Sequence, residues 1–415
     1  MPPVVEKALA IGRANVETLF AVANFGASSV FWLALAFLVP AARYGTLMTL
    51  QASVFLIVTA LTLRTHDLVF FLVGKRGFGV DRAFRTGFVI EITAALVATL
   101  ICAVASATVY PMPGANVAGA ALLGFVAGIG AAQGAAVAKL RYLVRGRTIM
   151  FADGACMIAW FSAGAIAYLL RNGPLVTLLV VGALPNAVRT VALLMGERRH
   201  HGNPGTCSDA SGWAERATIA RFLGGAQLTN FLKNGSVSIE TMILAAFCPP
   251  TSVAMYRLAK STQGAANAAI NVEYQRGFST LARAETHQQK RIALHRLQRV
   301  SMLLCVALYP VSALFALAYA LHKPEVGIWS FQLVTLGAFI AFLPAAIQQG
   351  YMAVLFQEGT HGIVNHAYVV SVVLLCLFAT TLFLWPTIWS FLLATIVAAV
   401  ARVCFLSVKA APLLS

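Results

Sequence analysis

The stretch SIETMILAAFCPPTSVAMYRLAKSTQGA, residues 238–265, places an apolar run on each side of a short turn. A helix needs about 20 mostly apolar residues to cross the hydrocarbon core of a bilayer. The second run nevertheless contains Arg257 and Lys260. Each such residue costs roughly 2.5 to 3.5 kcal/mol at the centre of a lipid-exposed helix. The stretch therefore predicts two adjacent membrane helices whose cations face protein, water or a polar solute.

The composition of the whole chain agrees with this interpretation. Of its 415 residues, 60% are hydrophobic and only 11% are charged, whereas an ordinary soluble protein carries about 25% charged residues. The formal net charge is +16, but the basic residues cluster between apolar runs, where they act as topology signals. We therefore expect an integral membrane protein and no nucleic-acid partner.

Apolar runs of spanning length follow one another along the chain. The polar seventh and eighth runs are those that a hydropathy window would miss most easily. The sequence predicts an all-α polytopic membrane protein with twelve spans, at residues 15–38, 47–73, 87–110, 117–138, 150–170, 174–195, 220–247, 251–275, 300–321, 327–356, 363–385 and 387–408.

A long polar segment, GERRHHGNPGTCSDASGWAER at residues 196–216, divides these spans into two groups of six. Its Gly, Asn, Pro and Ser residues are typical of a flexible joint. We expect an N-terminal six-helix lobe at residues 1–196, a cytoplasmic linker at 197–219 and a C-terminal six-helix lobe at 220–415.

Basic residues are distributed unequally between alternate loops. One side, which includes both termini, holds 21 Lys and Arg residues, and the other side holds only Arg43, Arg171 and Lys323. The positive-inside rule then predicts that both termini are cytoplasmic. The outer connections are short, so they offer no external domain for a polymerase, a ligase or a glycosyltransferase.

Polar residues recur along one face of the eighth span and of the seventh. On the eighth span their spacings of three and four residues form a single stripe. The eighth-span stripe is Arg257, Lys260, Gly264, Asn267 and Asn271, and the seventh-span residues are Asn230, Lys233 and Glu240. Two neighbouring polar stripes predict two walls of an aqueous cavity. Lys233 and Lys260 have no evident partner in the sequence.

For Glu240 and Arg257, which lie at a similar depth, two interpretations stay open. They form a structural ion pair, or Arg257 binds substrate. Arg64 in the second span adds a cation from the N-terminal half, and Asp67 three residues later is its local partner or an ion-coupling carboxylate.

Two more acids, Glu91 and Asp153, are further candidates for proton or sodium binding. Asp153 lies near the start of a span, so exposure to solvent is the simpler expectation for it. His66, beside Asp67, is expected to make a polar contact rather than to relay protons.

Recognisable catalytic and metal-binding motifs are missing from the sequence. The seven cysteines form no CxxC pair and have no His partner at zinc-finger spacing, so we infer neither disulfides nor a metal site. No GxxxxGK[ST] loop occurs, which argues against a self-contained ATP-driven pump. We expect a protein that is not an enzyme and carries no cofactor.

The chain resembles the polysaccharide-exporter flippases, Wzx-like members of the superfamily that also contains the MATE exporters. The likeness rests on the six-plus-six spans and on ARYGTLMTLQASVFLIVTAL (42–61) and residues 238–265, where Glu240, Tyr256 and Ala259 match the family order. The G-x-Y that is common in the family is AMY here. The resemblance implies a MATE-like fold.

The resemblance also implies a function. A Wzx-like protein moves a polyprenyl-diphosphate-linked oligosaccharide to the outer leaflet of the bacterial inner membrane by alternating access, alongside a polysaccharide polymerase and glycosyltransferases. The alternative is a MATE-type ion-coupled exporter of small molecules. Candidate substrate-binding residues are Arg64, Asn230, Lys233, Arg257, Lys260, Asn267 and Asn271, and candidate ion-coupling residues are Asp67, Glu91 and Glu240.

Overall fold

The computed structural model describes residues 20, 23–24, 26–63, 65–76, 78–108, 117–198, 212–263, 270, 286–357 and 361–414. At some helical positions in these ranges it describes the backbone but not the side chain. All regular structure in these ranges is helical. The chain has an all-α fold, as the sequence predicted, and it divides into two compact units.

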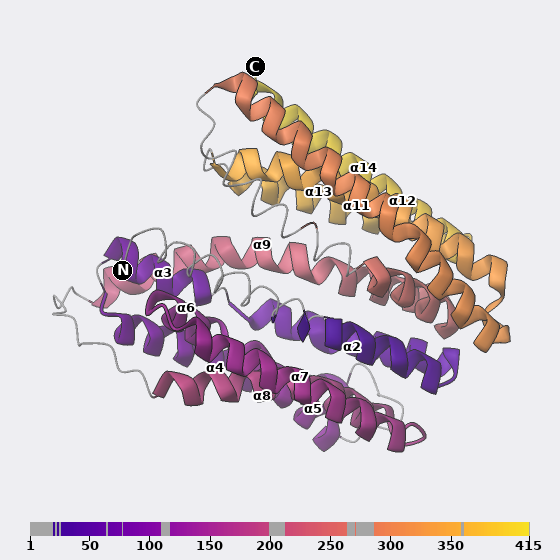
Figure 1. Ribbon diagram of the computed structural model, residues 1–415, viewed down its shortest axis with the longest axis horizontal. Coiled ribbons are helices and arrows are strands. Elements are labelled where there is room, and N and C mark those ends of the chain that lie inside the picture. The colour runs from indigo at the N-terminus through magenta and orange to yellow at the C-terminus, as the bar shows by residue number, and fades with distance from the viewer. Residues whose placement is uncertain are drawn as a thin grey trace, which may run out of the picture. The chain divides into compact units, whose positions relative to one another are not determined.

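The first unit comprises residues 1–38 and 53–231. Its described part contains nine helical segments (Figure 1). They are a helix at Gly26–Leu38, the last part of α2 (Ala41–Leu61), α3 (Thr65–Arg76), α4 (Val80–Thr108), α5 (Val117–Ala131), α6 (Gly134–Tyr142), α7 (Gly146–Leu169), α8 (Leu175–Arg198) and the first part of α9 (Gly212–Phe247).

The second unit comprises residues 39–52 and 232–415, so it takes the start of α2 and the end of α9. A helix at 250–263 follows α9 directly. The remaining helices of this unit are α11 (His287–His322), α12 (Ile328–Gln357), α13 (His361–Ala379) and α14 (Ile388–Ala410), joined by the 3-10 turns Pro324–Val326 and Thr380–Phe383 and ended by Ala411–Leu413. The predicted lobe boundaries at 196 and 220 stay a prediction.

Membrane spans can be recognised from helix length and apolarity. Within the described ranges, nine helices are long and apolar enough to cross a bilayer. Two shorter apolar helices, Gly26–Leu38 and Gly235–Phe247, lie in the predicted first and seventh spans, and the helix at 250–263 lies in the eighth. Every predicted span thus contains a described helix, and the chain is a multi-pass membrane protein.

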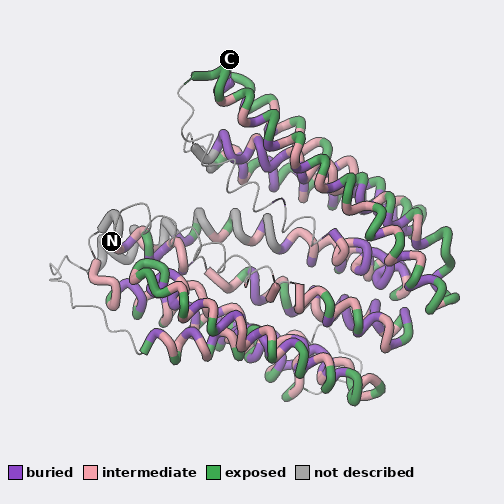
Figure 2. The backbone as a smooth tube through the Cα atoms, viewed as in Figure 1, coloured by how far each residue is buried: buried purple, intermediate pink, exposed green. Residues whose placement is uncertain are grey.

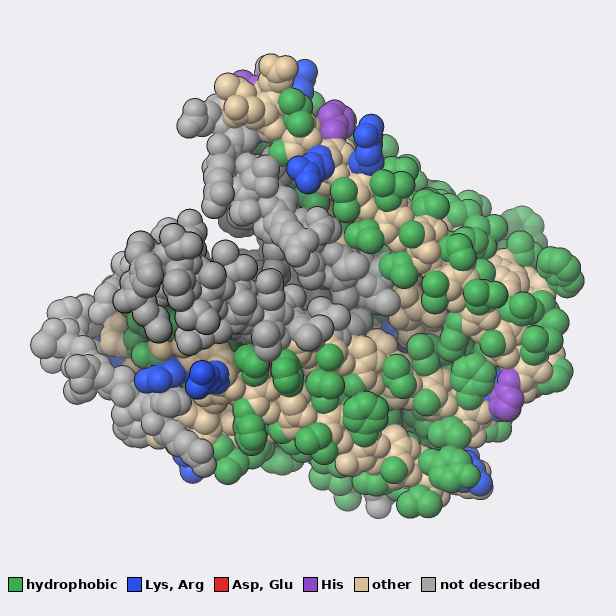
Figure 3. Space-filling model, viewed as in Figure 1, with side chains coloured by type: hydrophobic (Ala, Val, Ile, Leu, Met, Phe, Trp, Pro, Cys, Tyr) green, Lys and Arg blue, Asp and Glu red, His purple; other side chains and the backbone are tan. Residues whose placement is uncertain are grey.

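Burial alternates along the helices, with buried positions on one side and exposed positions on the other (Figure 2). The exposed positions are often apolar. On α7, Phe151, Ile158 and Phe161 are 72%, 70% and 68% exposed. Figure 3 shows hydrophobic side chains over much of the visible face, with Lys and Arg gathered toward helix ends. Water does not favour such a surface, but lipid does.

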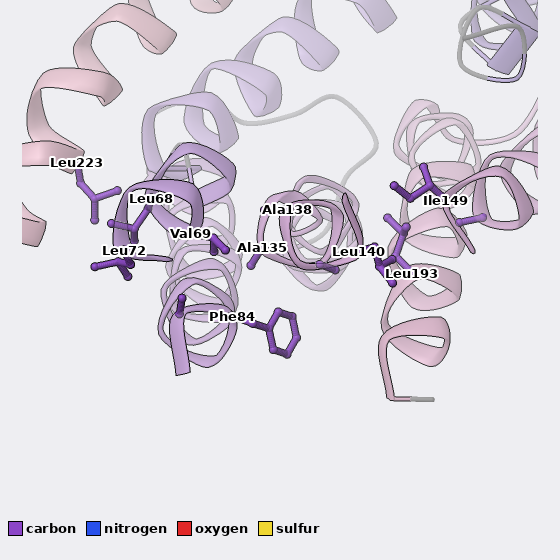
Figure 4. Close-up of a cluster of buried hydrophobic side chains, with 13 residues drawn as sticks. Leu68, Val69, Leu72, Phe84, Ala135, Ala138, Leu140, Ile149, Leu193 and Leu223 are labelled. Atoms are coloured by element: carbon purple, nitrogen blue, oxygen red, sulfur yellow. The ribbon is translucent and has the colours of Figure 1, made fainter. Parts of the chain in front are cut away.

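A buried apolar cluster joins the helices of the first unit (Figure 4). Leu68 and Leu72 of α3 and Phe84 of α4 belong to it together with Ala135 and Ala138 of α6. The small alanines allow α6 to pack closely between its neighbours. This cluster fixes α3, α4 and α6 relative to one another, which brings Glu91 of α4 beside Thr65 and Ala135.

Candidate functional site

The polar site of the second unit is built where the start of α2 meets the start of the helix at 250–263. Gly45 makes this approach possible, because a Cβ atom at that position would overlap the carbonyl oxygen of Pro250. Tyr44, the adjacent residue, is completely buried. The close approach brings Tyr44 and Gln51 of α2 to the polar face that begins at Tyr256.

Glu240 of α9 is the acidic member of this site. Its Oε2 atom accepts a hydrogen bond from the Tyr256 hydroxyl and lies 3.4 Å from Lys260 Nζ. The same ammonium group lies 5.5 Å from the centre of the Tyr256 ring. Phe391 of α14 packs edge-on against that ring, with the two centroids 5.2 Å apart. Glu240, Tyr256 and Lys260 therefore form one connected cluster.

Arg257 takes a different partner from the one that the sequence suggested. Its Nη2 atom donates a hydrogen bond of 3.1 Å to Gln51 Oε1, and it makes no ion pair with Glu240, which pairs with Lys260 instead. The Arg257 Nε atom is buried and has no hydrogen-bond partner. The Tyr44 hydroxyl, also buried and unpartnered, lies within electrostatic range of the guanidinium group.

The structure thus lacks the ion pair between Arg257 and Glu240, which was one of the two interpretations left open for Arg257. The expectation that Lys260 has no evident partner is wrong, because Glu240 is its partner. The reason is helical geometry: Lys260 follows Tyr256 by one turn, so both side chains reach the same carboxylate.

In the first unit, the structure reveals a polar cluster around Arg189, which we did not predict. Arg189 Nε donates a 2.6 Å hydrogen bond to Asp153 Oδ1, and its Nη1 atom donates to Gln133 Oε1. Asp153 is only 1% exposed. Our expectation that solvent surrounds Asp153 is therefore wrong, because α8 supplies a buried counter-ion. A single Arg within the apolar run of α8 was the sequence signal for this pair.

Glu91 of α4 is 3% exposed and makes no ion pair with any described residue. Its Oε1 atom accepts hydrogen bonds from the Thr65 hydroxyl and from the backbone N–H of Ala135, the latter at 3.0 Å. Asp67 lies beside His66, with Oδ1 and Nδ1 3.5 Å apart. At that length the contact is polar but weak.

Five of the proposed substrate-binding side chains cannot be placed. Arg64, Asn267 and Asn271 lie outside the described residues, and Asn230 and Lys233 lie on α9 where only the backbone is described. Among the residues with described side chains, no group of three or more His, Cys, Asp and Glu residues is arranged to hold a metal ion.

No protein-family model and no curated protein matches the sequence, but solved structures match its fold. The inward-facing conformation of a multidrug resistance MATE family transporter of the MOP superfamily gives a TM-score of 0.63 at 15% identity, over 97% of this chain and 98% of that one. The outward-facing conformation of a multidrug resistance MATE family transporter of the MOP superfamily gives a TM-score of 0.63 at 14% identity, over 97% of this chain and 96% of that one.

A variant of the Vibrio cholerae MATE transporter VcmN gives a TM-score of 0.55 at 15% identity, over 96% of this chain and 98% of that one. These matches extend over nearly the whole length of each chain. Likeness at such low identity shows architecture and leaves the activity to be argued from the site. The chain has the fold of MATE family transporters of the MOP superfamily.

Proposed function

We propose that this protein is a membrane transporter that moves polyprenyl-diphosphate-linked oligosaccharide from the cytoplasmic to the outer leaflet by alternating access. The fold supports the transport part of the proposal, because the matched structures include an inward-facing and an outward-facing conformation of MATE family transporters. The proposed place is the bacterial inner membrane with both termini in the cytoplasm, as the distribution of basic residues indicates. The substrate would be moved without chemical change, so no enzyme activity is proposed.

The observation that carries the substrate class is the state of Arg257. The described charged side chains of the site in the second unit are Glu240, Arg257 and Lys260, and Glu240 is already engaged with Lys260 and Tyr256. Among described residues the Arg257 side chain donates a hydrogen bond only to the neutral Gln51, and its Nε atom is unsatisfied. Glu240 lies within electrostatic range of the guanidinium group but forms no ion pair with it. A guanidinium group with free donors binds phosphate well, because its planar donors match the phosphate oxygens.

The remaining parts of the proposed site follow from the sequence. Lys233 and Arg64 would add positive charge for the diphosphate, and Asn230, Asn267 and Asn271 would bind sugar hydroxyls. Glycosyltransferases that build the lipid-linked unit and a polymerase that consumes it are the proposed functional partners.

A second candidate function is ion-coupled export of small molecules. Its support is that the matched structures include a transporter described as a multidrug resistance protein. An exporter of organic cations would use an acid of this site as its binding group. In the structure Glu240 is occupied by Lys260 and Tyr256. Over the described side chains of this site, Arg257 and Lys260 against Glu240 leave one excess positive charge, which favours an anionic substrate.

Ligand binding to the purified protein in nanodiscs distinguishes the flippase function from the export of small molecules. Arg257→Gln should weaken binding of a polyprenyl-diphosphate oligosaccharide at least tenfold, because a hydrogen bond to a charged group contributes about 1.5–3 kcal/mol. Arg257→Lys should retain part of the affinity, since it keeps the charge but loses the planar donors. Arg145→Gln, which removes an exposed cation from the turn after α6, is the matched control.

A second test compares ligands that carry the diphosphate with ligands that lack it. The same oligosaccharide on an uncharged polyprenol should bind weakly to the unmodified protein and respond little to Arg257→Gln. If an organic cation binds instead, and if Arg257→Gln leaves or strengthens its affinity, the export function is correct and the flippase proposal is wrong.

A further inference from the structure

Two interrupted spans of the first unit meet at one carboxyl group. The second span is broken between α2 and α3, and the fourth is broken between α5 and α6. Thr65 is the first residue of α3, Gly134 is the first of α6, and Glu91 of α4 lies against both. A Cβ atom on Gly134 would come 2.5 Å from Thr65 Oγ1 and 2.9 Å from Glu91 Oε1. Only glycine leaves room for this junction.

The hydrogen bonds of Glu91 are distributed unequally between its two oxygens. The Thr65 hydroxyl and the Ala135 N–H both donate to Oε1, and the Gly134 backbone N–H also lies close to the carboxyl group. The Oε2 atom is buried and has no hydrogen-bond partner. A carboxylate spreads its charge over both oxygens, and an ionised oxygen buried without a partner is costly. In a neutral carboxyl group Oε1 would be the carbonyl that accepts both bonds, and Oε2 would carry the proton.

The helices packed against α4 supply no described cation that could pair with this group. On α3 the nearest titratable residues are His66 and Asp67, which contact each other. The sequence of α5 contains no titratable residue. On α6, Lys139 is 2.5 Å from Asp81 Oδ1 and also pairs with Glu197. On α4 itself, Asp81 is the acid that pairs with Lys139. Arg82 and Arg85 precede Glu91 on the same helix by about 14 Å and about 9 Å along its axis.

We propose that Glu91 is a proton-binding site at the junction of the two interrupted helices. In the uptake step its carboxylate takes one proton from water on Oε2 and becomes a neutral acid, and release reverses this. A sodium ion would need several oxygen ligands around Oε2, and no described group of three or more His, Cys, Asp and Glu residues is arranged to hold a metal ion. A proton needs only the one oxygen.

The position of the site gives the proton a structural effect. In its ionised form Glu91 holds the N-terminal ends of α3 and α6, which carry partial positive charge and so favour a negative group. Protonation removes that charge attraction and leaves ordinary hydrogen bonds. The proton would therefore loosen the junction of α3 and α6 against α4. The idea that the transport cycle uses this proton rests on the function proposed above. The binding of the proton to Glu91 does not depend on that function.

Infrared difference spectroscopy of the purified protein, titrated with acid, detects the proton directly. The carbonyl stretch of a buried protonated carboxyl should rise as pH falls, and Glu91→Gln should remove this band. Glu325→Gln, at an exposed acid in the turn after α11, should leave the band in place. A band that persists in Glu91→Gln would overturn the proposal. So would a band that appears only in Arg64→Gln, because Arg64 would then be the partner that keeps Glu91 ionised.

Measurements of stability and transport distinguish a proton-binding role of Glu91 from a purely structural role. Gln has the shape of the protonated acid and can accept both hydrogen bonds. Glu91→Gln should therefore have the melting temperature of the unmodified protein at a pH where the infrared band is present, whereas Glu91→Ala should be destabilised. If Glu91→Gln fails to fold, the group is an obligatory anion and the proposal is wrong. In proteoliposomes Glu91→Gln should abolish the pH dependence of substrate flux. Flux that is absent in the unmodified protein would count against the proposed function, while the infrared band would still report on Glu91.

Discussion

The pairing of Glu240 with Lys260 makes a sharp prediction for single residues. Their side chains are 16% and 18% exposed, and loss of one partner from a buried pair costs roughly 3 kcal/mol because the other charge is left unpaired. Glu240→Lys and Lys260→Glu should each lower the melting temperature in detergent. The double exchange should recover much of the loss, since it restores an ion pair between the same two positions.

Arg257 provides the control for this exchange. It carries the same charge as Lys260 but bonds to Gln51, so Arg257→Glu combined with Glu240→Arg should not recover stability. Recovery by that second pair, and not by the first, would show that Arg257 is the working partner of Glu240.

What the sequence reveals about single residues depends on how far apart the partners are in the chain. The stripe of polar residues after Tyr256 is visible from helical spacing, and that spacing marks Lys260 as a site residue. The partners of Arg189 and Arg257 are not visible in this way, because Asp153 and Gln51 come from distant helices. Spacing along one helix says nothing about which helix will pack against it.

The close contact between Gly45 of α2 and the carbonyl group of Pro250 predicts that a single added methyl group at Gly45 lowers stability. Gly45→Ala would place its Cβ atom on the carbonyl oxygen of Pro250, and this backbone cannot move as a flexible side chain can. Overpacking of this kind costs about 1–3 kcal/mol. Gly164 is the matched control, because it lies inside α7 and a Cβ atom added there would have no other atom within 4 Å.

The expected results have opposite signs. Ala is favoured over Gly inside a helix by about 1 kcal/mol, so Gly164→Ala should leave the melting temperature unchanged or raise it. Gly45→Ala should lower it and should also weaken substrate binding, because Tyr44 and Gln51 would move away from Arg257. Equal melting temperatures for the two variants would show that the helices can separate at Pro250 without loss of stability.

The interruptions of two spans could not be predicted from hydropathy. The second and fourth spans are continuous in the sequence-based prediction, but the structure breaks them at residues 62–63 and 132–133. Distant side chains satisfy backbone groups near the breaks. Gln227 of α9 donates to the carbonyl oxygens of Thr59 and Ala60, and Glu91 accepts from Ala135. A broken helix is stable in a membrane only where such partners exist, and a window of sequence does not show them.

The assignment of residues to loops from the sequence is limited in the same way. Lys139 is one of the basic residues assigned to a cytoplasmic loop, yet it lies in α6, is 2% exposed and pairs with Asp81 and Glu197. It joins three helices and so contributes to packing as well as to topology. Removing it from the cytoplasmic set still leaves a large excess of basic residues on that side.

At the scale of the whole molecule, the bilayer explains why so much of the architecture was predictable. Spans must be helical, long and mostly apolar, so each of the twelve predicted spans contains a described helix. The same constraints allow the fold of MATE transporters to persist at 15% identity. They do not determine which solute the polar residues bind, because only a few side chains carry that information.

Orientation is the property of the whole molecule that the basic residues predict. Of the 24 Lys and Arg residues assigned to loops and termini, 21 lie on one side, and basic loops are retained in the cytoplasm. Reporter fusions after residues 80, 114, 205 and 325 should therefore be inside, outside, inside and outside. The fusion at 205 is decisive because it lies between the two groups of six spans. An external signal there, with the other three as expected, would require an even number of crossings between residues 114 and 205 in place of three, and the two-lobe topology would be wrong.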